Sequence, residues 1–166
     1  MFLSKAELED YGKRISNRRG KIFQEKYLHE VKGFPRVREL FQRVLADGKK
    51  IALASSAIGK ELETYKKVAN IADLLDAETS ADDAEQSKPH PDIFVAALEP
   101  LDDPPEEEAL VIGDTPYDIE AAGKAGLKTI AFRCGGFPEE TLQRAIAIYD
   151  EPADLLARYA NSPLSG

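Results

Sequence analysis

Four short apolar runs, separated by segments with helical spacing, decide which folds this sequence can adopt. The runs show almost no polar alternation, and they cover Ile51–Ala54, Ala109–Ile112, Thr129–Phe132 and Ala145–Tyr149. The helical segments between and after them fall near residues 59–70, 91–98, 116–125, 139–144 and 152–160. Strands that are apolar on both faces and alternate with helices indicate an α/β fold, in which helices flank a parallel sheet.

The first fifty residues predict helices and no strand. Residues 4–30 form one helical segment, in which Ser4 is the expected N-cap and Glu7 completes a capping box. The two glycines inside this segment are expected to divide it into shorter pieces. A further helix is predicted over residues 35–46, where apolar residues recur at helical spacing, and Gly48 is its expected C-cap.

The charge balance and the cysteine content exclude several classes of protein. The 166 residues carry a formal net charge of −8, whereas nucleic-acid-binding proteins usually present a basic stripe. A phosphate ester is compatible with this charge, since a pocket can be positive on a negative protein. The single cysteine forms no disulfide within the chain, no apolar run reaches the roughly 20 residues of a membrane span, and the start is too polar for a signal peptide. We therefore expect a cytoplasmic protein without nucleic-acid or membrane partners.

Polar residues directly after the apolar runs are candidates for a site, because parallel sheets bind ligands at the carboxyl ends of their strands. Ser55 and Ser56 follow the run that ends at Ala54. A hydroxyl group and the backbone N–H groups at a helix start can hold an anion such as phosphate. The alternative is that either serine only caps the following helix.

The second candidate is Lys88, which lies near two prolines in front of a predicted helix. Proline fixes φ and reduces the freedom of the segment, so the ammonium group can be aimed. A compact ammonium group can neutralise a phosphate or a carboxylate. The alternative is an ordinary surface lysine before a helix that starts with proline. His90, between the prolines, is expected to be a loop residue without a catalytic role.

The third candidate is a pair of carboxylates after the run that ends at Ile112. Asp114 and Asp118 are four residues apart, so Asp118 can face Asp114 from one turn inside the following helix. Paired carboxylates suit Mg²⁺, which takes one or two of them together with substrate oxygens and waters. The alternative is that Asp114 caps the helix and Asp118 complements the helix dipole.

In this order, the three sites resemble the haloacid dehalogenase superfamily. Ser55 stands at its second motif, Lys88 at its third, and Asp114 with Asp118 at its fourth. The resemblance covers roughly residues 33–159. It implies a Rossmann-like core and, through the spacing of the two aspartates, a magnesium-dependent phosphatase rather than a metal-free dehalogenase.

The resemblance also implies roles for single residues and a class of substrate. Segments 34–40 and 121–126 are similar to the phosphoglycolate-phosphatase and phosphomutase branch of the family. A small phosphorylated metabolite is the expected partner, and the protein is expected to be a monomer or a weak dimer. The implied roles are catalysis by Lys88 and Asp118, phosphate binding by Ser55, Ser56 and Lys88, and Mg²⁺ binding by Asp114.

The family's nucleophile motif, D-x-D at the end of a first strand, does not occur in this sequence. In the family the first aspartate attacks phosphorus and the second serves as general acid and base. The resemblance therefore implies that residues 1–33 are a remnant of the helical cap, that residues 34–166 are the core, and that the first strand is missing. We expect this chain alone to be nearly inert. The alternatives are a phosphate-binding remnant without catalysis, or a phosphomutase, which shares all three observed motifs.

The missing strand would lie between the runs that end at Ala54 and Ile112. The two strands are expected to pair directly or to leave a gap. Filling the gap with the N-terminal segment or with a strand from another chain is less favoured.

The sequence does not identify the substrate, because the cap supplies specificity in the family. A basic cluster in the N-terminal segment is expected to be mainly a solvated helix face, and it comprises Lys13, Arg14, Arg18, Arg19 and Lys21.

Overall fold

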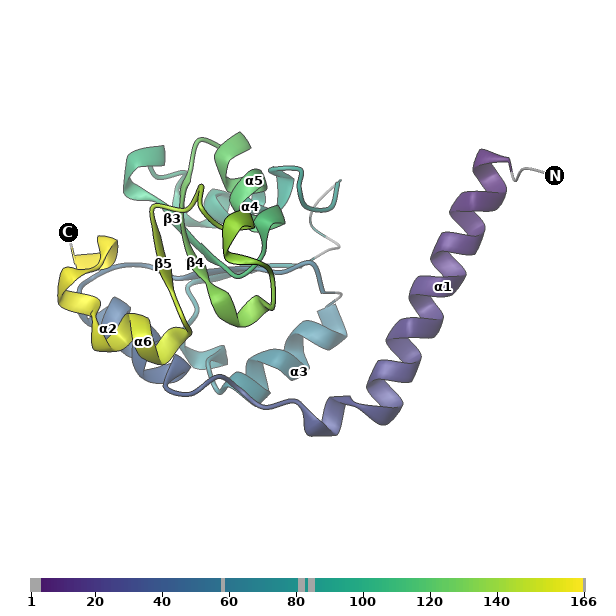
Figure 1. Ribbon diagram of the computed structural model, residues 1–166, viewed down its shortest axis with the longest axis horizontal. Helices are drawn as coiled ribbons and strands as arrows, with labels where there is room; N and C mark the ends of the chain where they lie inside the picture. The colour runs from purple at the N-terminus through teal and green to yellow at the C-terminus, as the bar shows by residue number, and fades with distance from the viewer. Residues whose placement is uncertain (1–3, 58, 81–82, 84–85, 166) are drawn as a thin grey trace. The chain divides into compact units, whose positions relative to one another are not determined.

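The computed structural model describes residues 4–57, 59–80, 83 and 86–165, and it divides the chain into two compact units. The first unit is Met1–Lys32 and the second is Gly33–Gly166. Figure 1 shows the helix of the first unit and the mixed α/β arrangement of the second. No helix in the described residues has both the length and the apolar character needed to cross a membrane.

The first unit consists of helix α1 (Lys5–Lys26), followed by a 3₁₀ turn at Leu28–Glu30. The predicted capping box is confirmed: the Ser4 hydroxyl accepts a hydrogen bond from the backbone N–H of Glu7, and the Glu7 carboxylate accepts one from the backbone N–H of Ser4. The expected division at the glycines is wrong, because α1 continues through Gly12 and Gly20. Each glycine costs a helix only about 1 kcal/mol, and no proline interrupts the segment.

The second unit contains helices and strands in the predicted order, with two exceptions that are described below. Its helices are α2 (Val37–Ala46), α3 (Gly59–Ala69), α4 (Asp92–Leu98), α5 (Pro116–Lys124) and α6 (Pro152–Ala157). Its strands are β1 (Ala52–Ala54), β2 (Ala77–Thr79), β3 (Leu110–Gly113), β4 (Lys128–Phe132) and β5 (Ala147–Tyr149). The predicted α/β class, with helices flanking parallel strands, is confirmed.

The strands form two parallel sheets rather than one. Strand β1 pairs with β2, and β3 pairs with β4, which pairs with β5. Within the described residues β1 and β3 are not paired with each other. Direct pairing of β1 with β3, one of the two expected arrangements, is therefore wrong. In the described residues, β1 and β3 each keep one edge without a neighbouring strand.

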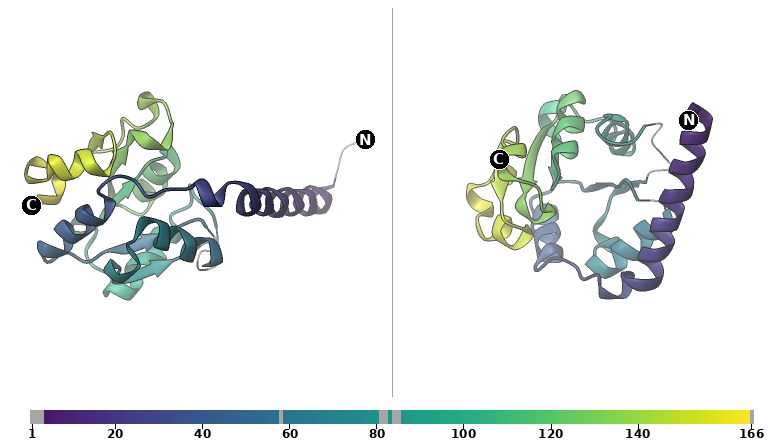
Figure 2. Two further views of the ribbon diagram at one scale, coloured as in Figure 1. Left: turned by 90° about the horizontal axis from the view of Figure 1, so that it is seen from below. Right: turned by 45° about the vertical axis from the view of Figure 1, so that its right-hand side comes forward.

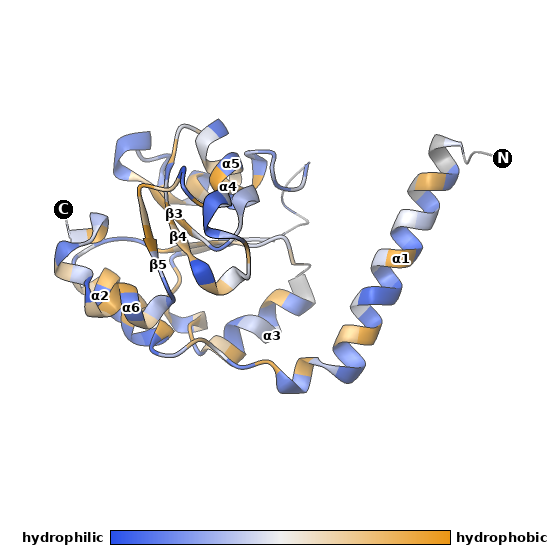
Figure 3. Ribbon diagram, viewed as in Figure 1, coloured by the Kyte–Doolittle hydropathy of each residue, from blue (hydrophilic) through white to orange (hydrophobic). Residues whose placement is uncertain are grey.

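Helices cover the three-stranded sheet on both faces. The side chains of β4 point alternately to one face and the other, so both faces have an apolar surface on which helices pack. Ile130 and Phe132 pack with residues of α2 and α6 in one core cluster, whereas Ala131 packs on the other face with Ile119 of α5. Figure 2 shows these two layers on either side of β3–β5. In Figure 3 the apolar colour covers much of these strands and parts of α2 and α6.

Two elements differ from the sequence-based expectation. Strand β2 was not predicted, since it has only three residues and its central residue is Glu78. The Glu78 carboxylate accepts a hydrogen bond from Lys66 of α3 at 2.5 Å, so a polar residue is accommodated within this strand. The helix predicted over residues 139–144 is only a 3₁₀ turn at Glu139–Thr141. Its last residues instead carry the chain towards β5, with Leu142 fully buried.

Candidate functional site

Lys88 lies between the end of β1 and the first turn of α5, the helix that follows β3. Its ammonium group donates a hydrogen bond to Asp118 Oδ1 at 2.7 Å and lies 3.5 Å from the backbone oxygen of Ala54, the last residue of β1. The ammonium nitrogen also lies 5.1 Å from the centroid of the Phe94 ring of α4. The side chain is only 17% exposed. The alternative of a free surface lysine is therefore wrong.

The loop that carries Lys88 is held from α5. Lys124, in the last turn of α5, donates a hydrogen bond to the backbone oxygen of Pro89 at 3.0 Å. The peptide bond between Lys88 and Pro89 is cis. The loop is thus fixed at one point by a hydrogen bond, next to a proline whose φ is restricted.

Asp118 is buried at the start of α5 and accepts several hydrogen bonds. Its Oδ2 atom accepts from the Thr115 hydroxyl at 2.7 Å, from the Thr115 backbone N–H at 3.0 Å and from the Asp114 backbone N–H at 3.3 Å. Burial acts to raise the pKa of Asp118, but the charge and hydrogen bond of Lys88, together with the bonds from Thr115, outweigh burial and hold this pKa below its ordinary value. The carboxylate is therefore ionised at neutral pH.

The N-cap of α5 is Thr115 and not Asp114, which the capping alternative had assumed. The Thr115 hydroxyl accepts a hydrogen bond from the Asp118 backbone N–H at 3.1 Å, which completes a capping box. The sequence signal for this was available, because Thr115 and Asp118 have the spacing of a capping box. With Thr115 in this role, the Asp114 side chain is not used to cap the helix.

Asp114 carries a half-buried carboxylate beside another negative charge. In the part of the chain that the structure describes, no cationic side chain forms an ion pair with it. Burial, and then repulsion from Asp118, raise the pKa of Asp114 above its ordinary value. A bound cation would lower this pKa, because it would stabilise the ionised carboxylate.

Two glycines allow the backbone around the aspartates to pack closely. A Cβ atom on Gly113 would lie 2.5 Å from the Cβ of Asp118, and one on Gly135 would lie 2.1 Å from the backbone oxygen of Asp114. Asp118 therefore folds back over the end of β3, and the turn Arg133–Gly135 after β4 packs against Asp114. The sequence alone does not reveal the contact of Gly135 with Asp114, since it depends on the order of strands in the sheet.

The two serines differ in position. Ser55 is half-buried and follows Ala54, whose backbone oxygen faces Lys88. Its hydroxyl accepts a hydrogen bond from the Ala57 backbone N–H at 3.1 Å, which forms a local turn ahead of α3. Ser56 is exposed, and so is His90. Binding of phosphate by Ser55, Ser56 and Lys88 stays a prediction.

The residues present can accommodate a magnesium ion, though not as a complete protein-only site. Within the described residues, no group of three or more histidine, cysteine, aspartate and glutamate side chains is arranged to hold a metal. Mg²⁺ usually keeps several waters and takes only one or two carboxylates, with substrate oxygens completing its shell. Asp114 offers such a carboxylate, because no ion pair engages it in the described residues.

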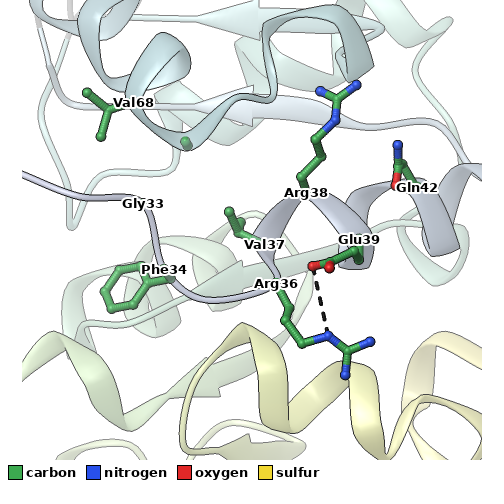
Figure 4. Close-up of a pocket in the computed structure, with 9 residues that line it drawn as sticks. Gly33, Phe34, Arg36, Val37, Arg38, Glu39, Gln42 and Val68 are labelled. Atoms are coloured by element: carbon green, nitrogen blue, oxygen red, sulfur yellow. Dashed lines mark ion pairs between the residues drawn. The ribbon is translucent and has the colours of Figure 1, made fainter.

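A hollow of about 340 Å³ lies at the start of α2, apart from this cluster. Figure 4 shows Val37, Arg38 and Val68 among its lining residues. The Arg38 guanidinium is already paired with Asp73 at 2.7 Å and with the backbone oxygen of Asn70 at 2.6 Å. Because the Arg38 guanidinium already has these protein partners, its presence in the hollow does not indicate a ligand.

Parallel strands, helices that flank them and a lysine–aspartate cluster at the carboxyl ends of the strands define a Rossmann-like α/β protein. Comparison with known families agrees with this class. The sequence model of the haloacid dehalogenase-like hydrolases matches residues 4–132. The chain belongs to this family.

Individual relatives support the same family assignment. The PpaX protein of Caldanaerobacter subterraneus subsp. tengcongensis is 31% identical over 135 residues, which are 81% of this chain and 56% of that protein. The pyrophosphatase PpaX of Bacillus mycoides is 35% identical over 101 residues, or 61% of this chain and 46% of the relative. A hydrolase from Pseudomonas syringae has a similar structure, with a TM-score of 0.80 and 26% identity over 97% of this chain and 75% of that one. The chain spans about half the length of the curated relatives it matches.

Proposed function

We propose that this chain supplies the phosphate- and magnesium-binding part of a phosphohydrolase site for a small phosphate monoester. The observation that supports the proposal is the position of Lys88, whose ammonium group lies between the end of β1 and Asp118. Asp114, with its raised pKa, lies next to this ion pair. One cation and one carboxylate that forms no ion pair in the described residues thus lie together at the carboxyl ends of parallel strands.

Each residue has a distinct role in this proposal. Lys88 neutralises a phosphate oxygen, and Asp118 orients the Lys88 ammonium group through their 2.7 Å hydrogen bond. Ser55 and Ser56 add hydroxyl and backbone donors at the end of β1. Asp114 holds Mg²⁺, which when bound supplies positive charge to the phosphate oxygens.

The same proposal makes this polypeptide nearly inert by itself. The family reaction needs an aspartate that attacks phosphorus, in a D-x-D motif that this sequence does not contain. Removing a nucleophile that acts as part of a unit can cost about 10⁶ in rate, so binding is expected to persist where turnover does not. The role of residues 1–33 as part of a helical cap belongs to this proposal as well.

The experiment measures binding and turnover separately. Magnesium and inorganic phosphate are titrated into the pure chain, followed by NMR amide shifts, and p-nitrophenyl phosphate is offered as substrate. We expect millimolar-range binding that shifts the amides of residues 113–118, with no turnover at an enzymatic rate. Asp114→Asn should weaken Mg²⁺ binding at least about tenfold. Asp10→Asn removes the same charge from an exposed position of α1 and should leave binding unchanged.

Two outcomes would contradict the proposal. Equal Mg²⁺ affinities for Asp114→Asn and Asp10→Asn would remove the role of Asp114. Turnover of p-nitrophenyl phosphate at an ordinary rate by the pure chain would overturn the predicted inertness while leaving the binding site intact.

Inorganic pyrophosphate is a second candidate ligand, favoured by the likeness to the pyrophosphatase PpaX of Bacillus mycoides. Lys88 recognises anionic oxygens and makes no distinction between a phosphate ester and a phosphoanhydride. Titrating pyrophosphate against 2-phosphoglycolate at equal Mg²⁺ concentration separates the two candidates. At least about tenfold tighter binding of pyrophosphate would favour it over the monoester.

A further inference from the structure

Helix α5 holds the segment around Lys88 at two points. In the first turn of α5, Asp118 accepts a hydrogen bond from the Lys88 ammonium group at 2.7 Å. In its last turn, Lys124 donates a hydrogen bond to the backbone oxygen of Pro89 at 3.0 Å. The two α5 residues are six positions apart in the sequence, or about 9 Å along the helix axis. One helix therefore contacts both the end of the Lys88 side chain and the backbone beside it.

Helix α5 is a well-packed support for these contacts. Ala121 and Ala122 of α5 are fully buried, and they pack in one apolar cluster with Ile93 and Phe94 of α4. Helix α4 begins directly after the loop that carries Lys88. The end of the loop is therefore fixed by packed helices, and the position of its earlier residues depends on further contacts.

The hydrogen bond inside the loop shapes it but does not place it on the rest of the protein. The His90 backbone N–H donates to the backbone oxygen of Ser87 at 3.1 Å, which closes a local turn around Lys88 and Pro89. Ser87 and His90 are both exposed, so burial does not hold the ends of this turn. The bond from Lys124 joins the turn to another element, because its acceptor belongs to the residue directly after Lys88.

Lys124 is itself held by Glu120, one turn earlier in α5. The Lys124 ammonium nitrogen lies 2.8 Å from Glu120 Oε1. This hydrogen bond, together with the charge of Lys124, holds the pKa of Glu120 below its ordinary value. An ammonium group has three donors, so Lys124 can bind Glu120 and the Pro89 oxygen at the same time. The alternative is that Lys124 forms only an exposed ion pair, which contributes little to stability.

The position of the Lys88 backbone matters because the Lys88 side chain is long and flexible. A lysine ammonium group is a compact charge at the end of a four-carbon chain. Asp118 engages one of its donors, which leaves the others for a phosphate oxygen in the proposed site. A displacement of about 1 Å can remove most of the effect of a group that acts on a bound ligand. A contact that fixes the backbone beside Lys88 therefore bears on phosphate binding.

We propose that Lys124 is a positioning residue for Lys88: by holding the Pro89 backbone oxygen, it keeps the Lys88 ammonium group at Asp118 and in the phosphate site. Lys124 acts through Lys88 and does not touch the phosphate itself. The phosphate part of this inference rests on the proposed function. The positional part, that Lys88 is held less firmly without Lys124, rests only on the contacts of α5.

The first experiment measures the position of Lys88 without any ligand. The full chain is treated with a trace of acetic anhydride, and mass spectrometry gives the rate of acetylation at Lys88 relative to that at the exposed Lys32. The Lys88 side chain is only 17% exposed and should react slowly in the parent. Lys124→Met removes the donor, so the loop should open more often and the relative rate should rise at least about threefold. Lys124→Arg keeps a donor and should restore the parental rate.

The second experiment measures whether this position matters for phosphate. Inorganic phosphate and Mg²⁺ are titrated separately into the full chain, followed by the amide shifts of residues 113–118. Lys124→Met should weaken phosphate binding about three- to tenfold and leave Mg²⁺ binding unchanged, a difference that general loss of structure would not produce. Lys128→Met removes the same charge from an exposed position at the start of β4, and it should bind phosphate as the parent does. Urea unfolding verifies that all variants are folded.

Three results would overturn this inference. The first is equal acetylation of Lys88 in the parent and in Lys124→Met. The second is a Lys124→Arg protein that behaves like Lys124→Met. The third is a phosphate affinity that Lys124→Met leaves unchanged, or lowers no more than Lys128→Met does. A parent chain that binds no phosphate at about 10 mM contradicts the proposed function instead, and the acetylation rates then decide the positioning role alone.

Discussion

The ion pair between Lys88 and Asp118 combines two side chains that are 17% and 8% exposed. Charges held this far from water are stabilising only as a pair, because each compensates the burial of the other. Asp118 also accepts bonds from Thr115 and from the Asp114 backbone, so its carboxylate cannot turn towards water without breaking the start of α5. The pair is therefore a structural element as well as a candidate for phosphate binding.

This predicts an asymmetry between single and double variants. Lys88→Met leaves the Asp118 carboxylate buried without its partner and should lower the free energy of unfolding by on the order of 3 kcal/mol. Lys88→Met combined with Asp118→Asn removes both charges while an amide oxygen still accepts from Thr115, so about half of this loss should return. Urea unfolding of the three proteins measures the difference. A double variant no more stable than Lys88→Met would show that charge burial is not the cause.

At the scale of elements, Gly12 and Gly48 show how the backbone conformation decides whether alanine is tolerated in place of glycine. Gly12 lies inside α1 and nothing approaches within 4 Å of the position of its missing Cβ. Gly48 follows α2 in equally open surroundings, but its φ is +75°. The same added methyl group is therefore accommodated at Gly12 and strained at Gly48.

We expect opposite signs for the two alanine substitutions. Gly12→Ala should stabilise α1 by up to about 1 kcal/mol, seen as slower amide exchange in the middle of the helix. Gly48→Ala should lower the free energy of unfolding of the second unit by about 1 kcal/mol. A Gly48→Ala protein as stable as the parent would contradict the left-handed conformation at that residue.

The sequence allowed most elements to be predicted, and the exceptions have physical causes. Strands β1, β3, β4 and β5 were predicted because their sequences are short apolar runs with almost no polar alternation. Strand β2 was missed because Glu78 pairs with Lys66, a contact between residues twelve positions apart that periodicity does not reveal. The position of Lys88 near the two aspartates was expected from the resemblance, whereas its contact with Ala54 required the fold.

At the scale of the whole molecule, Tyr159 links alkaline pH to stability. Burial, followed by a hydrogen bond with Asp47, raises the pKa of Tyr159 to about 12. A tyrosine in the unfolded chain ionises near pH 10. Between these values the unfolded state loses a proton that the folded state keeps, so the stabilisation is complete below about pH 10 and is lost as the pH rises towards 12.

Tyr159→Phe should therefore flatten the decline of stability above pH 10. Urea midpoints measured at pH 8, 10 and 11 give the slope, which is compared within each protein because the variant also loses a hydrogen bond at every pH. Tyr27→Phe, at a tyrosine that is 52% exposed, serves as the control and should keep the parental slope. Parallel declines for the parent and Tyr159→Phe would show that this phenol group is not the source.

The division of the strands into two sheets has a consequence for cooperativity. Backbone hydrogen bonds transmit order from β3 to β5, and separately from β1 to β2, but no ladder joins the two groups in the described residues. The two groups are connected instead by side-chain packing, which includes α4 and Ile51, and by the Lys88 side chain. The hydrogen bonds between β1 and β2 can therefore break while those of β3–β5 remain. We expect local unfolding of β1 and β2 to be an early step in denaturation.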